Sequence, residues 1–320
     1  MVNPRFARAT WGLVAFLLGV VAWGAYVRAT GSGAGCGAHW PVCNGEIVPR
    51  APALETLVEF SHRVSSGLVT LAVIAWAAWG YRAFPRGHRV QAGVVLGTVA
   101  ILVEGGIGAA LVLLRLTGKD ESLARAGVMA LHLVNTFFLL GVVTLTGAWA
   151  GGTGRPRLRD QGAIGVLVPA ALVAMVALGV SGAIAALGDT LFPARSLAEG
   201  FRQDLAGGAH LLLRLRVLHP LLAVAVALFL LGTAAVASLL RPGRQVRRTA
   251  IALAALVVVQ LTAGLVNLAL LAPVWMQVLH LFLADAVWLA LVVLGAAALA
   301  EDAPRLAVQG LGEPGSASAR

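Results

Sequence analysis

The sequence predicts an all-α membrane protein with eight transmembrane helices. Of its 320 residues, 59% are hydrophobic and only 12% are charged, which lies outside the usual range of a soluble domain. Eight apolar stretches each reach the roughly 20 residues that a helix needs to cross a bilayer. They lie at about residues 9–28, 58–81, 90–115, 124–150, 162–187, 207–240, 248–271 and 275–299. The first stretch lacks a small-residue cleavage site, so we expect it to be a retained span.

The arginines predict the orientation of the chain. They gather in alternate loops, which is the positive-inside pattern typical of multi-pass proteins. The clusters are Arg5 and Arg8; Arg82, Arg86 and Arg89; Arg155, Arg157 and Arg159; and Arg241, Arg244, Arg247 and Arg248. We therefore expect a protein of the cell (inner) membrane with both termini cytoplasmic. Because membrane topology accounts for the net charge of +10, we expect no nucleic-acid partner.

The second half of the chain repeats features of the first. Residues 130–133 (Ala-Leu-His-Leu) match 278–281 (Val-Leu-His-Leu), and Glu104 with Gly108 matches Gln260 with Gly264. Four spans per half is an even number, so tandem halves would share one orientation, related by a pseudo-two-fold axis along the membrane normal. We predict two tandem four-helix bundles, residues 1–155 and 156–300, and a disordered cytoplasmic tail at 301–320.

Four histidines lie near the outer ends of the even-numbered spans: His62, His132, His219 and His280. An ionisable side chain inside a bilayer is costly and calls for a partner. Two histidines from alternate helices of a four-helix bundle can supply both axial ligands of one heme iron. We interpret the four as metal ligands of two hemes, one in each half. Hydrogen bonds between helices are the alternative, and a zinc site is a weaker one.

The two halves differ beside their first histidines. Glu59 lies three residues before His62 and shares its helix face, whereas the matching position before His219 is Arg216. A carboxylate there could take up a proton from a substrate or stabilise positive charge on it, and an arginine is suited to a propionate. Arg63 and Arg216 are the candidate propionate contacts. A salt bridge between Glu59 and Arg63 is the alternative.

Among the polar residues within the apolar spans are Glu104, Asp285, Asn135 and Asn267. Glu104 itself lies near the middle of the third span, where a charge is costly. It is interpreted either as a protonated hydrogen-bonding residue that matches Gln260 or as part of a proton relay. The other three, Asp285, Asn135 and Asn267, are interpreted as structural polar contacts.

Both cysteines, Cys36 and Cys43, lie in the glycine-rich loop between the first two spans. The positive-inside pattern places this loop outside, where the compartment is oxidising, and a disulfide is predicted. On the chain-entropy model it would contribute about 2.5 kcal/mol. Two roles stay open, a structural staple and a redox pair that relays electrons.

In combination these features resemble the heme A synthase family over essentially the whole chain. The resemblance is carried by the eight spans, the cysteine loop, the four histidines and the run at residues 59–63 (Glu-Phe-Ser-His-Arg). It implies that His62 and His132 hold the substrate heme O in the N-terminal half. The cofactor heme b would lie between His219 and His280 in the C-terminal half. This family oxidises one ring methyl of heme O to a formyl group by successive hydroxylations, and Glu59 matches its catalytic acidic residue.

The resemblance also implies partners, which are heme O synthase, a membrane electron acceptor and the lipid bilayer. Two other functions compete with this oxidoreductase. A bis-histidine diheme electron-transfer cytochrome would have the same histidines but no need for Glu59 beside only one heme. A heme or small-molecule transporter would be expected to show inverted repeats and broken helices.

Overall fold

The structure is a computed structural model that describes residues 2–157, 159–301 and 303. Within these residues, eight helices are long and apolar enough to cross a membrane, which confirms the predicted all-α membrane fold. They are α1 (Pro4–Ala29), α2 (Leu54–Ala83), α3 (Arg89–Leu113), α4 (Leu123–Ala150), α5 (Ala163–Leu191), α7 (Leu211–Leu240), α8 (Arg244–Ala269) and α9 (Val274–Ala298). Two short elements, the 3-10 helix η1 (Ser32–Ala34) and α6 (Leu197–Leu205), lie in connecting segments.

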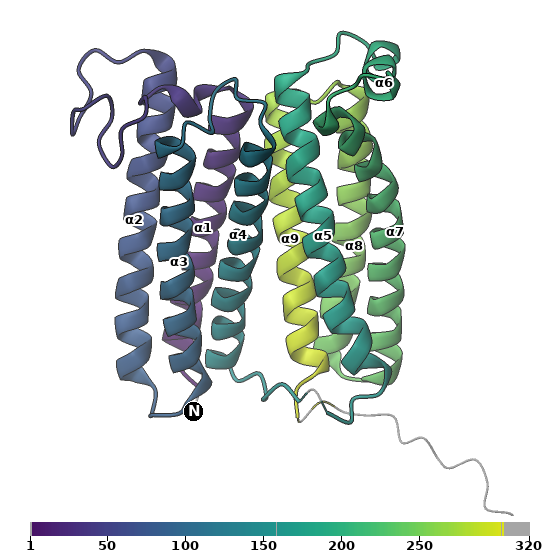
Figure 1. The fold of residues 1–320 in the computed structure, drawn as a ribbon. Coiled ribbons are helices and arrows are strands. Elements are labelled where there is room, and N and C mark those ends of the chain that lie inside the picture. Colours follow the sequence, from purple (N-terminus) through teal and green to yellow (C-terminus); the bar gives the residue numbers. More distant parts are fainter. Residues whose placement is uncertain (1, 158, 302, 304–320) are drawn as a thin grey trace, which may run out of the picture.

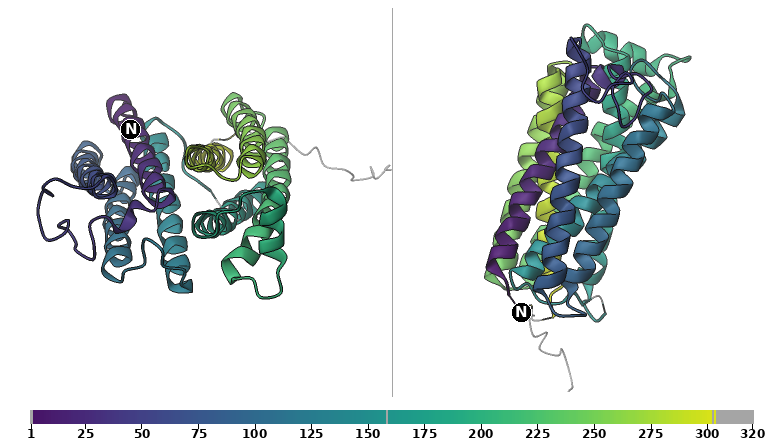
Figure 2. Two further views of the ribbon diagram at one scale, coloured as in Figure 1. Left: turned by 90° about the horizontal axis from the view of Figure 1, so that it is seen from above. Right: turned by 90° about the vertical axis from the view of Figure 1, so that its left-hand side faces the viewer.

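The long helices form two groups that lie side by side. Helices α1 to α4 make one group, and α5, α7, α8 and α9 make the other, with α1 and α4 facing α5 and α9 (Figures 1 and 2). The loops after α1, α3, α5 and α8 gather at one end, opposite the N-terminus (Figure 1). We call this the cysteine end, because the loop after α1 carries Cys36 and Cys43. The pseudo-two-fold axis, the boundary at residue 155 and the sidedness of the membrane stay predictions.

Side chains cap the first turn of some of the helices. The backbone N–H of Phe6 donates to the Asn3 side chain at 3.1 Å, and Pro4 occupies the first turn of α1. Ser122 caps α4 in the same way, accepting from the Arg125 N–H at 3.2 Å. Such caps satisfy N–H groups that the first turn leaves without partners. Along the spans the backbone bonds to itself, as an apolar environment demands.

The two groups pack closely where an aromatic pair spans the boundary. The Trp288 ring on α9 stacks on Phe137 of α4, with centroids 4.9 Å apart, and its Nε1 donates to the Phe137 carbonyl at 2.8 Å. On α5, a Cβ added at Gly179 would lie 2.9 Å from the Leu133 side chain. Small residues allow this close approach, and dispersion contacts then hold the helices together in lipid.

The predicted span at 207–240 begins too early. Helix α7 starts at Leu211, with His210 as its N-cap, and a separate helix α6 precedes it. Residues 206–209 (Ala-Gly-Gly-Ala) are uncharged and so extend the apolar stretch in the sequence, but they do not form helix. This explains why the predicted span starts before α7. The tail predicted to be disordered falls, apart from Glu301 and Ala303, outside the described residues.

Candidate functional site

A cavity of about 1580 Å³ runs through both helix groups. Ligand pockets usually measure roughly 300–1,000 Å³, so this one has room for more than one large ligand. Its walls are mostly apolar, and all four predicted ligand histidines line it: His62, His132, His219 and His280. Each histidine lies in roughly the first three turns of its helix, counted from the cysteine end.

In the first group, His62 of α2 lies against α1 and near His132 of α4. A Cβ added at Gly24 would lie 2.9 Å from the His62 ring, so only glycine leaves room for it. The charges of His62 and His132 are close enough to interact. Among the described residues, the buried Nδ1 of His62 has no hydrogen-bond partner. This ring is therefore held by packing rather than by a polar contact.

The second group repeats this packing. A Cβ at Gly182 would lie 3.0 Å from the His219 ring, and one at Gly264 would lie 3.0 Å from the His280 ring. His219 and His280 are also close enough for their charges to interact. Unlike His62, His219 has a polar partner, because its Nδ1 lies 2.9 Å from the Ser181 hydroxyl. Such a bond orients a ligand histidine and leaves its other nitrogen for the metal.

Polar residues of α3 and α8 lie beside the second histidine of each pair. Gln260 approaches His280, with 3.4 Å between their Nε2 atoms. Glu104 lies 3.2 Å from the His132 Nδ1, in a geometry that is not a hydrogen bond. Its carboxylate accepts from the Asn135 amide at 2.5 Å and from the Thr136 hydroxyl. These contacts fit the hydrogen-bonding interpretation of Glu104, and the proton relay stays a prediction.

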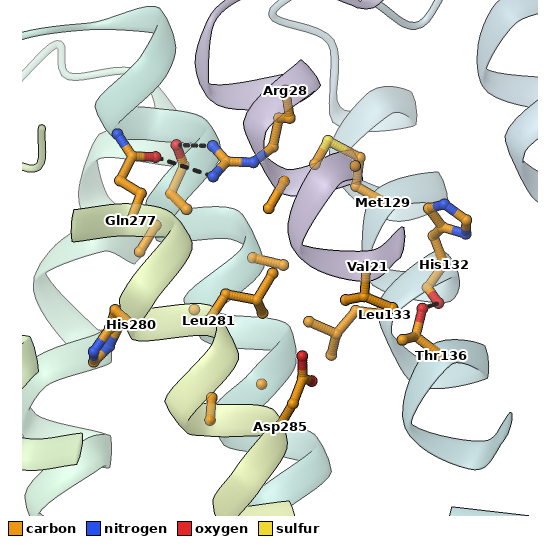
Figure 3. A pocket seen from close by; sticks show the side chains of 18 of the residues that line it. Val21, Arg28, Met129, His132, Leu133, Thr136, Gln277, His280, Leu281 and Asp285 are labelled. Carbon is orange, nitrogen blue, oxygen red and sulfur yellow. Dashed lines mark hydrogen bonds between the residues drawn. The ribbon is translucent and has the colours of Figure 1, made fainter. Parts of the chain in front are cut away.

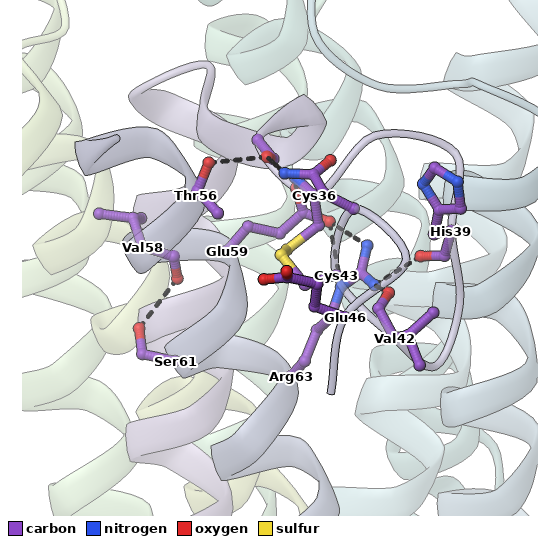
Figure 4. The surroundings of a disulfide bond; sticks show 12 residues. Cys36, His39, Val42, Cys43, Glu46, Thr56, Val58, Glu59, Ser61 and Arg63 are labelled. Atoms are coloured by element: carbon purple, nitrogen blue, oxygen red, sulfur yellow. Dashed lines mark hydrogen bonds and ion pairs between the residues drawn. A yellow bond between two sulfur atoms is a disulfide. The ribbon is translucent and has the colours of Figure 1, made fainter. Parts of the chain in front are cut away.

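The predicted catalytic residue Glu59 is buried, at 4% exposed, and lines the cavity. It accepts a hydrogen bond from the Cys36 N–H at 2.8 Å and forms an ion pair with Arg63. Arg63 also donates to the carbonyls of His39, at 2.6 Å, and Val42, at 2.7 Å. The alternative salt bridge is therefore present, and it ties the cysteine loop to α2 one turn above His62 (Figure 4).

The predicted disulfide between Cys36 and Cys43 is present, with both cysteines fully buried. Its loop packs tightly on α2, since the Thr56 hydroxyl donates to the Gly35 carbonyl at 2.8 Å. A Cβ at Gly35 would lie 2.5 Å from the Glu55 backbone. This packing suits a structural staple, while the redox alternative stays open.

Arg216, the other candidate propionate contact, is held by two carboxylates. It donates to Asp204 at 2.5 and 3.0 Å and to Asp189 at 3.1 Å. Helix α6 is thereby tied to α7 and α5. Arg63 and Arg216 thus both have carboxylate partners, and their role toward a ligand stays a prediction.

Of the three residues interpreted as structural polar contacts, Asn135 makes such contacts in the structure, and Asp285 and Asn267 each have an oxygen without a partner among the described residues. Asn135 makes polar contacts, to Glu104 and to the Ala100 carbonyl at 2.9 Å. In contrast, the buried Oδ1 atoms of Asp285 and Asn267 have no hydrogen-bond partner within the described chain. Asp285 lies at the boundary between the helix groups and lines the cavity (Figure 3).

Sequence reasoning missed two cavity residues, Arg28 and Arg125. Both stand at the end of a span, where an arginine is ordinarily counted as a loop charge. Helical spacing is the sequence signal that could have identified Arg125 as a cavity residue. Arg125 precedes His132 by seven residues, which places the two on one face of α4.

The chain matches the sequence model of the COX15-CtaA family, described as cytochrome oxidase assembly protein, over residues 7–292. The chain belongs to this family. Among other COX15-CtaA-like sequences, the heme A synthase of Alkalihalophilus pseudofirmus is 38% identical over 124 residues, covering 38% of this chain and 39% of that protein. The heme A synthase of Halalkalibacterium halodurans is 36% identical over 133 residues, covering 42% of each chain. The resemblance to heme A synthases is confirmed.

A longer similarity joins this COX15-CtaA member to proteins named protoheme IX farnesyltransferase from two strains of Thermus thermophilus. One of them is 51% identical to this chain over 313 residues, and the other is 50% identical over 313 residues. Each alignment covers 98% of this chain and 51% of the relative. The chain therefore spans about half the length of these relatives.

Proposed function

We propose that this member of the COX15-CtaA family is a heme A synthase, a membrane oxidoreductase that acts on heme O. A ring methyl of heme O is hydroxylated twice, and the geminal diol loses water to give the formyl group. The observation that carries the proposal is the asymmetry of the cavity: two histidine pairs line it, and the position three residues before the first histidine is Glu59 in one group and Arg216 in the other. His62 and His132 hold the substrate, and His219 and His280 hold the cofactor heme b.

The residues present fit a porphyrin in each compartment. Imidazole is a common axial ligand of heme iron, and all four histidines line the cavity. The three glycines that back His62, His219 and His280 let those rings pack directly against a neighbouring helix backbone. When bound, heme b supplies one-electron redox chemistry. Ser181 orients His219 for this ligand through its Nδ1.

Glu59 has two tasks in this proposal. Its contacts to Arg63 and the Cys36 N–H fix the carboxylate at the cysteine end of the first compartment. From there it takes up a proton released at the reacting methyl carbon or stabilises positive charge on the substrate. Because Arg216 occupies the matching place in the second group, that compartment has no such acid at this position.

The relatives support a further part of the proposal, a link to heme O synthase. A protoheme IX farnesyltransferase by name, about twice as long as this chain, contains a segment similar to nearly all of it. An enzyme that makes farnesylated heme is the natural source of heme O. We propose it as a partner, with a membrane electron acceptor that removes the reducing equivalents. The chain lies in the cell membrane, with both termini cytoplasmic and the cysteine loop outside.

Co-expression with a heme O-producing system tests the activity. Membranes that hold heme O should accumulate heme A when this chain is present, as measured by heme extraction and chromatography. Glu59→Gln should retain bound heme and lower heme A formation by roughly 100- to 10,000-fold, the usual range for a general acid or base. Glu55→Gln is the matched control, since Glu55 is exposed one turn earlier on α2.

The competing function has its own outcome in this experiment. Bound heme with no formyl product from the wild-type protein would contradict a synthase and favour a diheme electron-transfer cytochrome. Equal heme A formation by wild type and Glu59→Gln would remove Glu59 from the reaction.

A further inference from the structure

Arg28 lines the cavity from the last turn of α1 and has only neutral hydrogen-bond partners within the described chain. Its guanidinium donates to the Ala186 carbonyl at 2.8 Å, the Thr190 hydroxyl at 2.9 Å and the Gln277 side-chain oxygen at 3.0 Å. Figure 3 shows it between Gln277 on one side and Met129 and His132 on the other. Among the described residues it forms no ion pair with a carboxylate.

Arg125 lines the same cavity from the first turn of α4 and is 4% exposed. Its Nη1 donates to the carbonyls of Gly118 and Asp120, each at 2.8 Å. Its buried Nε has no partner, and within the described chain it forms no ion pair. The first turn of α4 adds to this positive charge, because the N-terminus of a helix carries a positive partial charge of its own.

Arg28 is partly buried, Arg125 is buried, and neither forms an ion pair within the described chain, so the two cations together favour an anion at this end of the cavity. A guanidinium stays charged in proteins, and removing it from water is costly unless an opposite charge is near. The charges of Asp189 and Arg125 both act on Arg28, the carboxylate more strongly than the second guanidinium. The nearest carboxylates are engaged elsewhere: Asp189 pairs with Arg216, and Asp120 accepts from Ser122 at 2.7 Å.

Helical spacing places Arg125 beside the first histidine pair, and Arg28 extends from α1 of the same group to partners on α5 and α9 at the boundary. Arg125 lies seven residues before His132, so it shares that face of α4 about 10 Å nearer the cysteine end. Arg28 lies four residues after Gly24, one turn nearer that end than the glycine that backs His62. The two guanidiniums therefore stand on the cysteine-end side of the first compartment.

The second compartment has no equivalent arginines at the matching positions. The residue seven before His280 is Pro273, and the residue four after Gly182 is Ala186. Its arginine, Arg216, is paired with Asp204 and Asp189. The compartments thus differ in the placement of arginines that form no ion pair within the described chain.

We propose that Arg28 and Arg125 bind the two propionates of the porphyrin in the first compartment. The ligand class is a porphyrin dicarboxylate whose acidic edge points to the cysteine end. This inference rests on the proposed function, and it assigns the propionate role to residues other than Arg63 and Arg216. Both arginines can form charge-assisted bonds to a carboxylate, which are stronger than bonds between neutral groups.

A binding titration with an esterified ligand tests the proposal without measuring turnover. The host is the full chain with His219→Ala, which removes one axial ligand from the second compartment. The probes are protoheme and protoheme dimethyl ester, followed by the Soret band of the bis-histidine complex. We expect protoheme to bind the host roughly 10- to 100-fold more tightly than the ester, from the usual strength of hydrogen bonds to charged groups.

Arginine substitutions complete the test. Arg28→Gln and Arg125→Gln should each weaken protoheme binding roughly tenfold or more and leave ester binding nearly unchanged, because the ester has already lost the charge. Arg202→Gln is the control, since Arg202 is exposed on α6 at the same end. It should change neither affinity.

The outcomes separate this inference from the proposed function. Equal affinity for protoheme and its ester, or an equal loss of both in the arginine variants, would overturn the propionate assignment while heme binding stands. The comparison of protoheme with its ester uses the His219→Ala host, in which both arginines are present. It therefore still tests the proposal if Arg28→Gln or Arg125→Gln fails to fold. Failure of the wild-type chain to bind protoheme would overturn the proposed function itself.

Discussion

Ser181 makes the clearest difference between two otherwise similar histidines. Its hydroxyl lies 2.9 Å from the His219 Nδ1, whereas the His62 Nδ1 has no partner among the described residues. A bond at Nδ1 fixes the tautomer and the ring orientation, and it leaves Nε2 available for a ligand. Under the proposed function, the ring of the cofactor site is oriented by a hydrogen bond, and the ring of the substrate site is held by packing alone.

Ser181→Ala tests this difference at the residue scale. Loss of the hydrogen bond should weaken heme binding in the second compartment by roughly 10- to 100-fold, the usual effect of removing such a partner. Heme content after purification and titration of the stripped protein measure it. Thr249→Ala is the control, since the Thr249 hydroxyl bonds to backbone carbonyls of its own helix and does not line the cavity. Unchanged heme affinity in Ser181→Ala would show that the bond does not orient a ligand.

At the scale of elements, glycines set how closely each helix approaches a histidine. On α1, Gly24 backs His62, and α5 and α8 supply Gly182 and Gly264 to the histidines of the second group. The recurrence of one contact on three helix pairs indicates that ring position, rather than general packing, determines these residues. The fourth histidine, His132, has the Glu104 carboxylate beside it instead of a glycine.

Gly24→Ala should disturb the first compartment selectively. The added methyl would lie 2.9 Å from the His62 ring, which must shift or rotate, and protoheme affinity at the first pair should fall at least about tenfold because ligand geometry is lost. Gly19→Ala on the same helix is a matched control, since nothing lies within 4 Å of its Cβ position. Titration of both variants in the His219→Ala host measures the effect. Equal affinities would mean that His62 is not held against α1.

The elements also show how far sequence alone could go. Eight spans were predictable because lipid requires long apolar helices, and the disulfide was predictable from cysteine spacing and topology. The start of α7 and the existence of α6 were not, since hydropathy does not separate glycine and alanine loops from helix. Arg28 and Arg125 were missed because an arginine at a span end has the same sequence signature in a loop and in a cavity. Only the packing of α1, α4, α5 and α9 separates the two cases.

The whole molecule joins two helix groups around one cavity. Phe137 and Trp288 stack across the boundary, and Arg28 of α1 donates to residues of α5 and α9. The charged contacts that line the cavity at the cysteine end tie the loops to the helices. Helices of the second group therefore hold Arg28 of the first group in place. The proposed substrate and cofactor would lie side by side at similar depth, as electron transfer between them requires.

The central claim is that four histidines hold two hemes in separate compartments, and heme stoichiometry in paired histidine variants tests it most directly. Wild-type protein purified from heme-replete cells and saturated with protoheme should bind two hemes per chain with bis-histidine absorption spectra. His62→Ala with His132→Ala should bind one, and His219→Ala with His280→Ala should bind the other. A colourless wild-type protein, or variants that keep both hemes, would contradict the account.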